Sequence, residues 1–304
     1  MKYLVTGVTG QLGAEIALQL LNSNPNIEVY GLGRKNAPLE LKRYLNFFEH
    51  KCDITDFGYL EKLFLEIMPD VVIHCAAWTN VEAAEKQENH AEVINTNVCS
   101  TAILAKLCNE YNKKLLYIST DFVFGNNHAF YEDLNPLNFY GETKRAGERI
   151  IENYTNSKFF IVRVGWTFGK YGKNFVSKII ELANYLPVIN VVYDEIGTPT
   201  YAEDAAAEII NIVNSDKYGT YNLSESGNSI SRAQFAKVIL NTIKELGFKN
   251  DTVISPVSSE QLIYLAKRPK YSVMDISNLV ANGFNPLPKW QIGLKKYLQM
   301  ELSK

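Results

Sequence analysis

The chain has 304 residues, of which 46% are hydrophobic and 21% are charged, and its formal net charge is −2. These values are typical of a globular protein, and the length predicts one large α/β domain with a smaller lobe. The scattered basic residues exclude the broad basic surface of a nucleic-acid-binding protein, and no apolar run approaches the ~20 residues of a membrane span, so a small-molecule partner is expected.

The first apolar run, residues 1–6, meets a glycine turn at once, whereas a signal peptide has a longer apolar segment and a cleavage site. The four cysteines show no Cys-x-x-Cys spacing, and two of them end apolar runs. We therefore expect reduced thiols and a cytoplasmic protein. Its assembly stays open, with a homodimer as one expectation.

Apolar runs rich in Val and Ile alternate with segments of helical period along the first half of the chain. The expected strands are 3–6, 28–32, 47–52, 71–75, 114–119 and 159–164. The expected helices are 11–21, 59–67, a broken segment over 81–111, and 140–154. This alternation predicts an α/β fold with a doubly wound, Rossmann-like parallel sheet covered on both faces.

After about residue 165 the alternation loosens, with turn signals at 169–172 and 197–199 and two late helices at 232–246 and 289–298. We expect residues 1–165, with a return segment at about 190–222, to form a dinucleotide-binding domain. Residues of about 166–189 and 223–304 are expected to form a smaller, C-terminal substrate-binding lobe.

A glycine-rich turn, Thr-Gly-Val-Thr-Gly-Gln-Leu-Gly at residues 6–13, joins the first strand to the first helix. Glycines there permit a tight turn and a close approach of the backbone, so the N–H groups and the positive helix end can bind a pyrophosphate. The spacing Gly-x-x-Gly-x-x-Gly resembles that of the extended short-chain reductases. The cofactor contacts expected in this turn are Gly7, Gly10, Gln11, Leu12 and Gly13.

The second strand ends at Gly33-Arg34-Lys35, where NAD-specific proteins of this fold place an acid on the ribose 2′-hydroxyl. A cation at this point suits a 2′-phosphate, so we expect NADPH, with NADH also accepted. A solvated surface pair is the alternative for Arg34 and Lys35. The third strand is followed by Asp53 and Ile54; Asp53 resembles an adenine-contacting acid of the family, and its alternative role is to cap the next helix.

Tyr140 and Lys144 open a helix at a spacing that puts both side chains on one face. Reduction of a ketone needs a proton, and a phenol with an ordinary pKa near 10 is a weak acid/base unless a cation stabilises its anion. Thr120 ends an apolar strand at the sheet edge where ligands bind, and can hydrogen-bond the reacting oxygen. A core tyrosine beside a surface lysine is the alternative interpretation. Asp121 is interpreted as an acceptor for a sugar hydroxyl or as a turn former.

Seven segments, taken in order, resemble the dTDP-4-dehydrorhamnose reductase family of the short-chain dehydrogenase/reductase superfamily over nearly the whole chain: 75–85, 119–124, 140–144, 162–166, 174–176, 197–200 and 267–269. The resemblance implies that Tyr140 donates the proton, that Lys144 supports it and holds the nicotinamide ribose, and that Thr120 tunes the transfer. The further implied contacts are Cys75, Ala76 and Ala77 with the cofactor, and Thr120, Asp121, Trp166, Asn174 and Arg268 with the sugar nucleotide.

The reaction that this resemblance implies belongs to nucleotide-sugar metabolism. It is hydride transfer from NAD(P)H to the C4 keto group of a nucleotide-linked 4-keto-6-deoxysugar, with dTDP-4-dehydro-L-rhamnose reduced to dTDP-L-rhamnose. Trp166 has an indole plane that could stack on a sugar or base, or be packed in the core. Arg268 could pair with a diphosphate through its planar fork, or form a surface ion pair.

Departures from the family pattern leave the sugar and the base open. Phe122 stands where a Tyr is usual, Phe139 stands where a smaller residue often precedes the catalytic Tyr, and Gly125-Asn126-Asn127 replaces a usual Asp-Gly turn. None of these changes removes a proton donor.

Two other functions stay open. A 4-epimerase would oxidise C4 transiently, and a non-catalytic NAD(P)-binding regulatory subunit would keep only the fold. An intact Tyr140 and Lys144 argue against the second, and Phe122 argues against a 4,6-dehydratase, which carries a proton-transferring Glu at that place. We expect no metal site, because the four histidines lack ligand-like spacing; an accessory divalent ion stays open.

Overall fold

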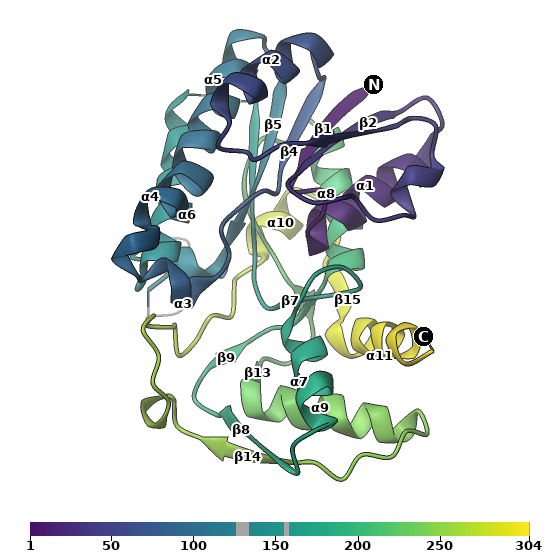
Figure 1. Cartoon of the computed structure of the whole chain (residues 1–304), viewed down its shortest axis with the longest axis vertical. Coiled ribbons are helices and arrows are strands. Elements are labelled where there is room, and N and C mark those ends of the chain that lie inside the picture. Colours follow the sequence, from purple (N-terminus) through teal and green to yellow (C-terminus); the bar gives the residue numbers. More distant parts are fainter. Residues whose placement is uncertain (126–133, 155–157, 304) are drawn as a thin grey trace.

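The computed structural model describes residues 1–125, 134–154 and 158–303. Its centre is a seven-stranded sheet with the strand order β11-β6-β5-β4-β1-β2-β3, in which all neighbours run parallel (Figure 1). The strands are β1 (Lys2–Thr6), β2 (Glu28–Gly33), β3 (Phe47–Lys51), β4 (Val71–His74), β5 (Lys114–Thr120), β6 (Phe159–Val164) and β11 (Gly219–Leu223). The predicted Rossmann-like α/β fold is confirmed.

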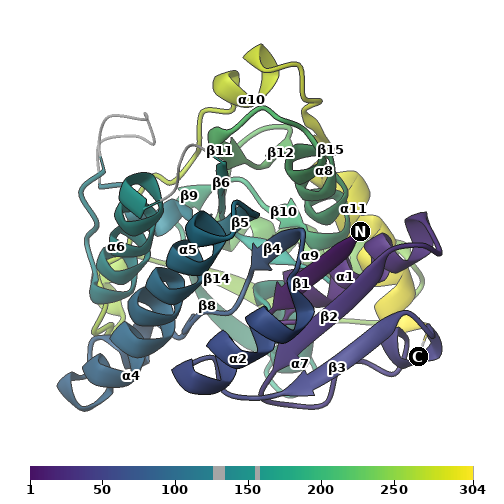
Figure 2. The same ribbon diagram turned by 90° about the horizontal axis from the view of Figure 1, so that it is seen from above.

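Helices cover both faces of this sheet (Figure 2). One face carries α1 (Gln11–Ser23) and α8 (Ala202–Asn214); the other carries α2 (Phe57–Ile67), α5 (Ser100–Glu110) and α6 (Phe139–Tyr154). Strand β1 shows why its sequence is apolar throughout. Val5 packs with the α1 and α8 side and Leu4 with the α2 and α5 side, because neighbouring strand residues point to opposite faces.

The segment expected to be a broken helix is broken into four short pieces before α5. They are α3 (Val81–Ala84), a 3₁₀ turn (Gln87–Asn89), α4 (His90–Ile94) and a π-helical turn (Asn95–Cys99) that runs directly into α5. Single π turns inside helices are frequent at functional sites.

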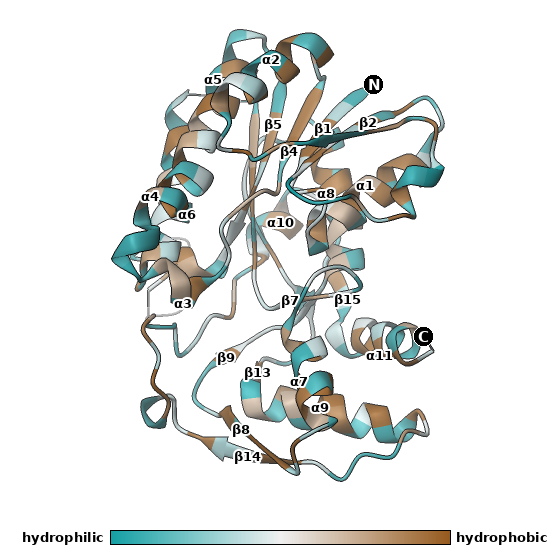
Figure 3. Cartoon of the chain, viewed as in Figure 1, coloured by the Kyte–Doolittle hydropathy of each residue, from teal (hydrophilic) through white to brown (hydrophobic). Residues whose placement is uncertain are grey.

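A second apolar core lies below the sheet in the view of Figure 1. It is built by α7 (Phe175–Ala183), α9 (Arg232–Glu245), α11 (Trp290–Leu302) and the parallel pair β8 (Val188–Val192) and β14 (Val253–Val257). The hydropathy colouring of Figure 3 shows these helices brown on one side and teal on the other, as expected for half-buried helices.

Prediction was less complete in this second half. The two expected late helices correspond to α9 and α11, whereas α7, α8 and α10 (Ser277–Ala281) were not expected. Within the expected return segment of 190–222, β11 is a strand of the large sheet and α8 packs against that sheet. The end of β8, which also falls in this segment, pairs with β14 in the second core instead. The borders between the two expected parts stay a prediction.

Two short parallel strand pairs lie within the second half of the chain: β7 (Thr167–Phe168) with β10 (Thr200–Tyr201), and β12 (Glu225–Ser226) with β15 (Leu287–Lys289). A third pair, β9 (Ile196–Gly197) with β13 (Ile230–Ser231), places the start of α9 beside the segment that follows β8. Among the described residues, no helix is both long and apolar enough to cross a bilayer.

Candidate active site

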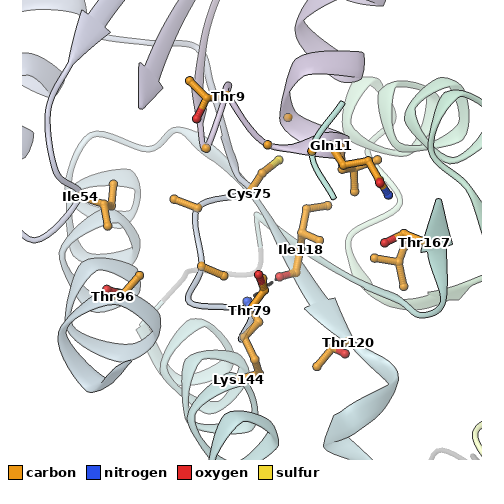
Figure 4. A pocket seen from close by; sticks show the side chains of 18 of the residues that line it. Thr9, Gln11, Ile54, Cys75, Thr79, Thr96, Ile118, Thr120, Lys144 and Thr167 are labelled. Atoms are coloured by element: carbon orange, nitrogen blue, oxygen red, sulfur yellow. Dashed lines mark hydrogen bonds between the residues drawn. The ribbon is translucent and has the colours of Figure 1, made fainter. Parts of the chain in front are cut away.

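A cleft of about 690 Å³ runs along the carboxyl ends of β1, β2, β4, β5 and β6 (Figure 4). This is a typical volume for a ligand site, at the edge where parallel sheets of this kind bind ligands. All predicted cofactor residues line it: Gly7, Gly10, Gln11, Leu12, Gly13, Arg34, Asp53, Ile54, Cys75, Ala76, Ala77, Tyr140 and Lys144. Thr120, Asp121 and Trp166 line it too, whereas Asn174 and Arg268 are not among its lining residues.

The glycine turn leaves no room for a side chain at Gly7 or at Gly13. Gly7 has a φ of +70°, and a Cβ there would lie 2.7 Å from the backbone nitrogen of Ala76. A Cβ on Gly13 would lie 2.4 Å from the carbonyl oxygen of Gly7. Gly10 caps α1 with no side-chain hydrogen bond, so the first N–H groups of the helix can bind an anion. This cradle fits a pyrophosphate.

At the end of β2 the cationic side chain of Arg34 is shared by two carboxylates. Its Nη1 lies 3.6 Å from Asp53 Oδ2 and 3.6 Å from Glu92 Oε1. Burial raises the pKa of Asp53, but two hydrogen bonds from Thr55 and the charge of Arg34 bring that pKa below its ordinary value. Asp53 does not cap the next helix, because Asp56 does so by accepting from the backbone of that helix.

Lys144 lies under the floor of the cleft. Its Nζ donates to the carbonyl oxygen of Ile118 at 2.7 Å, drawn as a dashed line in Figure 4, and lies 3.9 Å from the centre of the Tyr117 ring. Burial lowers the pKa of Lys144 to about 7, and the nearby Glu148 opposes this shift. The ammonium is therefore held by a backbone oxygen and an aromatic face.

Thr120, Asp121 and Tyr140 come together beside this lysine. The Thr120 hydroxyl donates to Asp121 Oδ1 at 3.0 Å and accepts from the backbone of Phe122. Burial raises the pKa of the Tyr140 phenol; a hydrogen bond with Thr120 opposes the rise and the charge of Asp121 adds to it. The phenol is thus a protonated group at neutral pH, poised next to a hydroxyl that can share its proton.

A buried chain of hydrogen bonds connects the glycine turn to the helix of Tyr140. Thr6 Oγ1 lies 2.7 Å from His74 Nδ1, and His74 Nε2 lies 3.1 Å from Thr101 Oγ1. Thr101 donates to the Asn97 carbonyl, and the Asn97 amide donates to Thr143 on α6. Burial lowers the pKa of His74 to about 3, so this histidine is neutral. The sequence contained no local signal for this network, because its members come from five separate elements.

The helix of Tyr140 is also anchored from below. Glu148 on α6 accepts from Arg163 on β6 at 2.7 and 2.8 Å, and both side chains are almost fully buried. Two parallel hydrogen bonds between a guanidinium and a carboxylate fix the relative orientation of the two side chains as well as their distance. Its effect is to hold α6 against the sheet edge that carries Thr120.

The other predicted substrate residues have partners within the protein. Trp166 has a φ of +52°, and its Nε1 donates to Ser272 Oγ at 3.0 Å. Asn174 caps α7, and its amide donates to the Gly169 carbonyl. Arg268 forms an ion pair with Glu82 of α3.

Two of the positions that depart from the family pattern, Phe122 and Phe139, pack in one apolar cluster with Tyr140. Phe122 contacts the Tyr140 ring edge-on, with centroids 5.8 Å apart, and Phe139 stacks on His90 at 3.9 Å. Asn126 and Asn127 lie outside the described residues. In the part of the chain that the structure describes, no cluster of three or more His, Cys, Asp or Glu side chains could hold a metal ion.

Comparison with known proteins agrees with this geometry. The model of the family described as RmlD substrate binding domain matches residues 1–303. The chain is 32% identical to dTDP-4-dehydrorhamnose reductase of Aggregatibacter actinomycetemcomitans, over 97% of each protein, and 33% identical to the spore coat polysaccharide biosynthesis protein SpsK of Bacillus subtilis, over 98% of this chain and 97% of the relative.

Among solved structures, dTDP-4-dehydrorhamnose reductase of Bacillus anthracis in complex with NADP superposes with a TM-score of 0.82. The two sequences are 33% identical, and the match covers 98% of this chain and 99% of that chain. The chain therefore belongs to the RmlD substrate binding domain family, the family of the dTDP-4-dehydrorhamnose reductases.

Proposed function

We propose that this chain is an NAD(P)H-dependent oxidoreductase that reduces the C4 keto group of a nucleotide-linked 4-keto-6-deoxysugar. The favoured reaction converts dTDP-4-dehydro-L-rhamnose to dTDP-L-rhamnose. The observation that carries the proposal is that one cleft joins the glycine cradle to the buried group of Thr120, Tyr140 and Lys144. The names of the relatives support it, and so does the NADP complex of the Bacillus anthracis protein.

The residues of the cleft fit a dinucleotide. The turn from Gly7 to Gly13 would hold its pyrophosphate, Arg34 its 2′-phosphate, and Asp53 with Ile54 its adenosine half, while Cys75, Ala76 and Ala77 would form the wall beside it. NADPH is favoured because the segment Gly33-Arg34-Lys35 carries no acid, and Arg34 would bind a 2′-phosphate in competition with its present ion pairs to Asp53 and Glu92. NADH keeps its other contacts. When bound, the reduced nicotinamide supplies the hydride that reduces the keto carbon to an alcohol carbon.

The protein supplies the proton. Tyr140, held protonated by its burial, donates to the oxygen of the keto group as negative charge develops there. Thr120 hydrogen-bonds the same oxygen and keeps it within reach of the phenol. Lys144, when charged, stabilises the tyrosinate that remains and holds the nicotinamide ribose. Asp121 and Trp166 would contact the sugar.

Asn174 and Arg268 stay predicted substrate contacts. Arg268 Nη1 is buried with no hydrogen-bond partner among the described residues, so it has a donor to offer a diphosphate. Its pairing with Glu82 would have to yield for a direct contact. A homodimer and a cytoplasmic location also stay predictions.

The test is a steady-state assay of NADPH oxidation with a panel of 4-keto-6-deoxysugars linked to dTDP, UDP or GDP. We expect turnover with the dTDP-linked sugars and a product with a C4 hydroxyl group. Product formation without net oxidation of NADPH would point to the epimerase, and tight NADPH binding with no turnover on any sugar would point to the regulatory subunit. Either result would refute the proposed reaction.

A further inference from the structure

Arg232, the first residue of α9, lies behind the substrate end of the cleft and is not among its lining residues. Its guanidinium carbon lies 3.5 Å from the ring centre of Trp166 and 5.1 Å from that of Phe175. A planar cation stacks well on an indole, and the attraction grows when water is excluded. Arg232 therefore covers a face of the Trp166 ring that the substrate cannot use.

The rest of the indole is held just as closely. Its Nε1 donates to Ser272, and a Cβ on Gly197 would lie 2.3 Å from the ring. Ser272 and Gly197 therefore confine the ring at its nitrogen and at the backbone, and the Arg232 guanidinium is the group that covers one of its faces.

Arg232 also provides a positive charge near two buried carboxyl groups. Its Nε lies 3.9 Å from Glu195 Oε2, and its backbone N–H donates to the Glu195 carbonyl. Asp121 Oδ2 and Glu195 Oε1 are buried without a hydrogen-bond partner among the described residues. Two buried anions without enough donors are costly, and a nearby guanidinium offsets that cost.

The groups around Asp121 shift the pKa of its carboxyl in opposite directions. Burial raises the pKa of Asp121 above its ordinary value, and hydrogen bonds with Thr120 and Ser272 and the charge of Arg232 only partly oppose that rise. The groups that act on Arg232 itself are Glu195, Asp121, Arg268 and Tyr264. Arg232 is thus the cation that favours the ionised form of Asp121.

From these contacts we infer that Arg232 is a positioning residue for the sugar of the substrate, which acts by fixing the Trp166 indole and by placing a positive charge behind the carboxyl groups at this end of the cleft. The inference rests on the proposed function. The ligand class is a neutral, hydroxyl-bearing sugar, because a buried carboxylate recognises hydroxyl donors and an indole edge packs on a sugar ring.

The test compares Arg232→Met, which removes charge and stacking, with Arg232→Lys, which keeps the charge alone. For Arg232→Met we expect about a tenfold rise in the KM of the 4-keto sugar nucleotide, unchanged NADPH affinity, and an acid limb of kcat/KM that moves to higher pH. For Arg232→Lys we expect the rise in KM without the pH shift. Lys237→Met, an exposed charge loss on the same helix, is the control and should change neither.

Wild-type KM and acid limb in a folded Arg232→Met variant would overturn the inference. If that variant loses NADPH binding, and so has not folded, Arg232→Lys decides alone, and a wild-type KM there would overturn the stacking role. Calorimetric binding of dTDP-L-rhamnose in the presence of NADP⁺, measured with the same variants, reports on sugar affinity without turnover. The proposed reaction can therefore fail, through an inactive wild type, separately from the role of Arg232.

Discussion

The two ends of the cleft are built in different ways. At the cofactor end the surface for the pyrophosphate is mostly backbone from one turn of eight residues; Gly13 closely approaches Gly7 within this turn, and Gly7 approaches Ala76 beyond β4. At the substrate end the ligand surface consists of side chains, and Asp121, Trp166 and Arg232 come from segments far apart in the sequence. The pyrophosphate turn of the cofactor end is thus largely a local feature of the chain, whereas the substrate end exists only once the two cores have folded together.

The arginines at the two ends of the cleft also differ in how far they are buried. Arg34 at the cofactor end is exposed for 65% of its side chain, and ion pairs of exposed groups contribute little free energy. Arg232 is mostly buried, beside carboxyl groups that lack other donors. Changes at the cofactor rim should therefore adjust cofactor preference, while changes where the two ends meet should stop the reaction.

The largest effect is expected at Tyr140, where both ends meet. Tyr140→Phe removes only the transferable proton, so turnover should fall by ~10²–10⁴-fold while NADPH affinity stays near wild type. Single-turnover kinetics and a fluorescence titration with NADPH measure the two quantities. Tyr154→Phe, at the exposed end of the same helix, is the matched control. A Tyr140→Phe enzyme within a few-fold of wild type, with chemistry rate-limiting, would remove Tyr140 from the mechanism.

Lys144 is expected to affect both ends at once. Its pKa is lowered to about 7, so the side chain is charged below that pH and loses its charge as the pH rises through it. We expect kcat/KM for NADPH to fall on the alkaline side of about pH 7, and Lys144→Met to lose about 10²-fold in turnover together with this pH dependence.

Lys144→Arg sharpens this prediction, because its charge does not titrate and the alkaline limb should disappear while part of the NADPH affinity remains. If Lys144→Met kept both the NADPH affinity and the pH profile of wild type, Lys144 would have no part in holding the ribose or the tyrosinate.

The same contrast explains what the sequence could predict. The strand and helix alternation up to residue 164 and the glycine turn are patterns of neighbouring residues, and both predicted the observed elements. The pairing of β8 with β14 joins residues more than sixty positions apart, so no local pattern revealed it. Helix α7 does begin with a local signal, the capping box of Asn174 and Ser177, which the prediction did not use. Likewise, no sequence spacing predicts that Arg232 stacks on Trp166 or that His74 bonds to Thr6, because only the fold brings these residues together.

A smaller effect is expected at Arg34. Arg34→Ala should lower kcat/KM for NADPH about tenfold and leave that for NADH unchanged, since the guanidinium would contact only the 2′-phosphate. Glu92→Gln frees Arg34 from one of its two carboxylates and should raise the preference for NADPH by a smaller factor. Specificity constants for both cofactors at two salt concentrations measure this. An equal change for NADPH and NADH would show that Arg34 does not contact the 2′ position.

The smallest effect is expected away from the cleft, at Glu225 of β12. Burial raises the pKa of this carboxyl from 4.5 to about 9, and the charge of Asp204 adds to the rise. The folded protein therefore holds a proton that the unfolded chain releases, and the free energy of unfolding should fall as the pH rises from about 4.5 to about 9.

Glu225→Gln should remove this slope and raise the free energy of unfolding by a few kcal/mol at pH 8, with turnover unchanged. Denaturant unfolding of both proteins at a series of pH values measures it. Parallel slopes in the two proteins would show that Glu225 is ionised in the folded state, and a loss of turnover would show that this region does affect the cleft.

The measurement that tests the central claim most directly follows one hydrogen from the cofactor end of the cleft to the substrate end. The wild-type protein is incubated with dTDP-4-dehydro-L-rhamnose and NADPH that carries deuterium at both C4 positions of its nicotinamide, and the product is analysed by mass spectrometry and NMR. We predict one deuterium per molecule of dTDP-L-rhamnose, at C4 of the sugar, with one NADP⁺ formed for each product. A product without deuterium at C4, or deuterated NADPH that stays unconsumed while the sugar reacts, would contradict it.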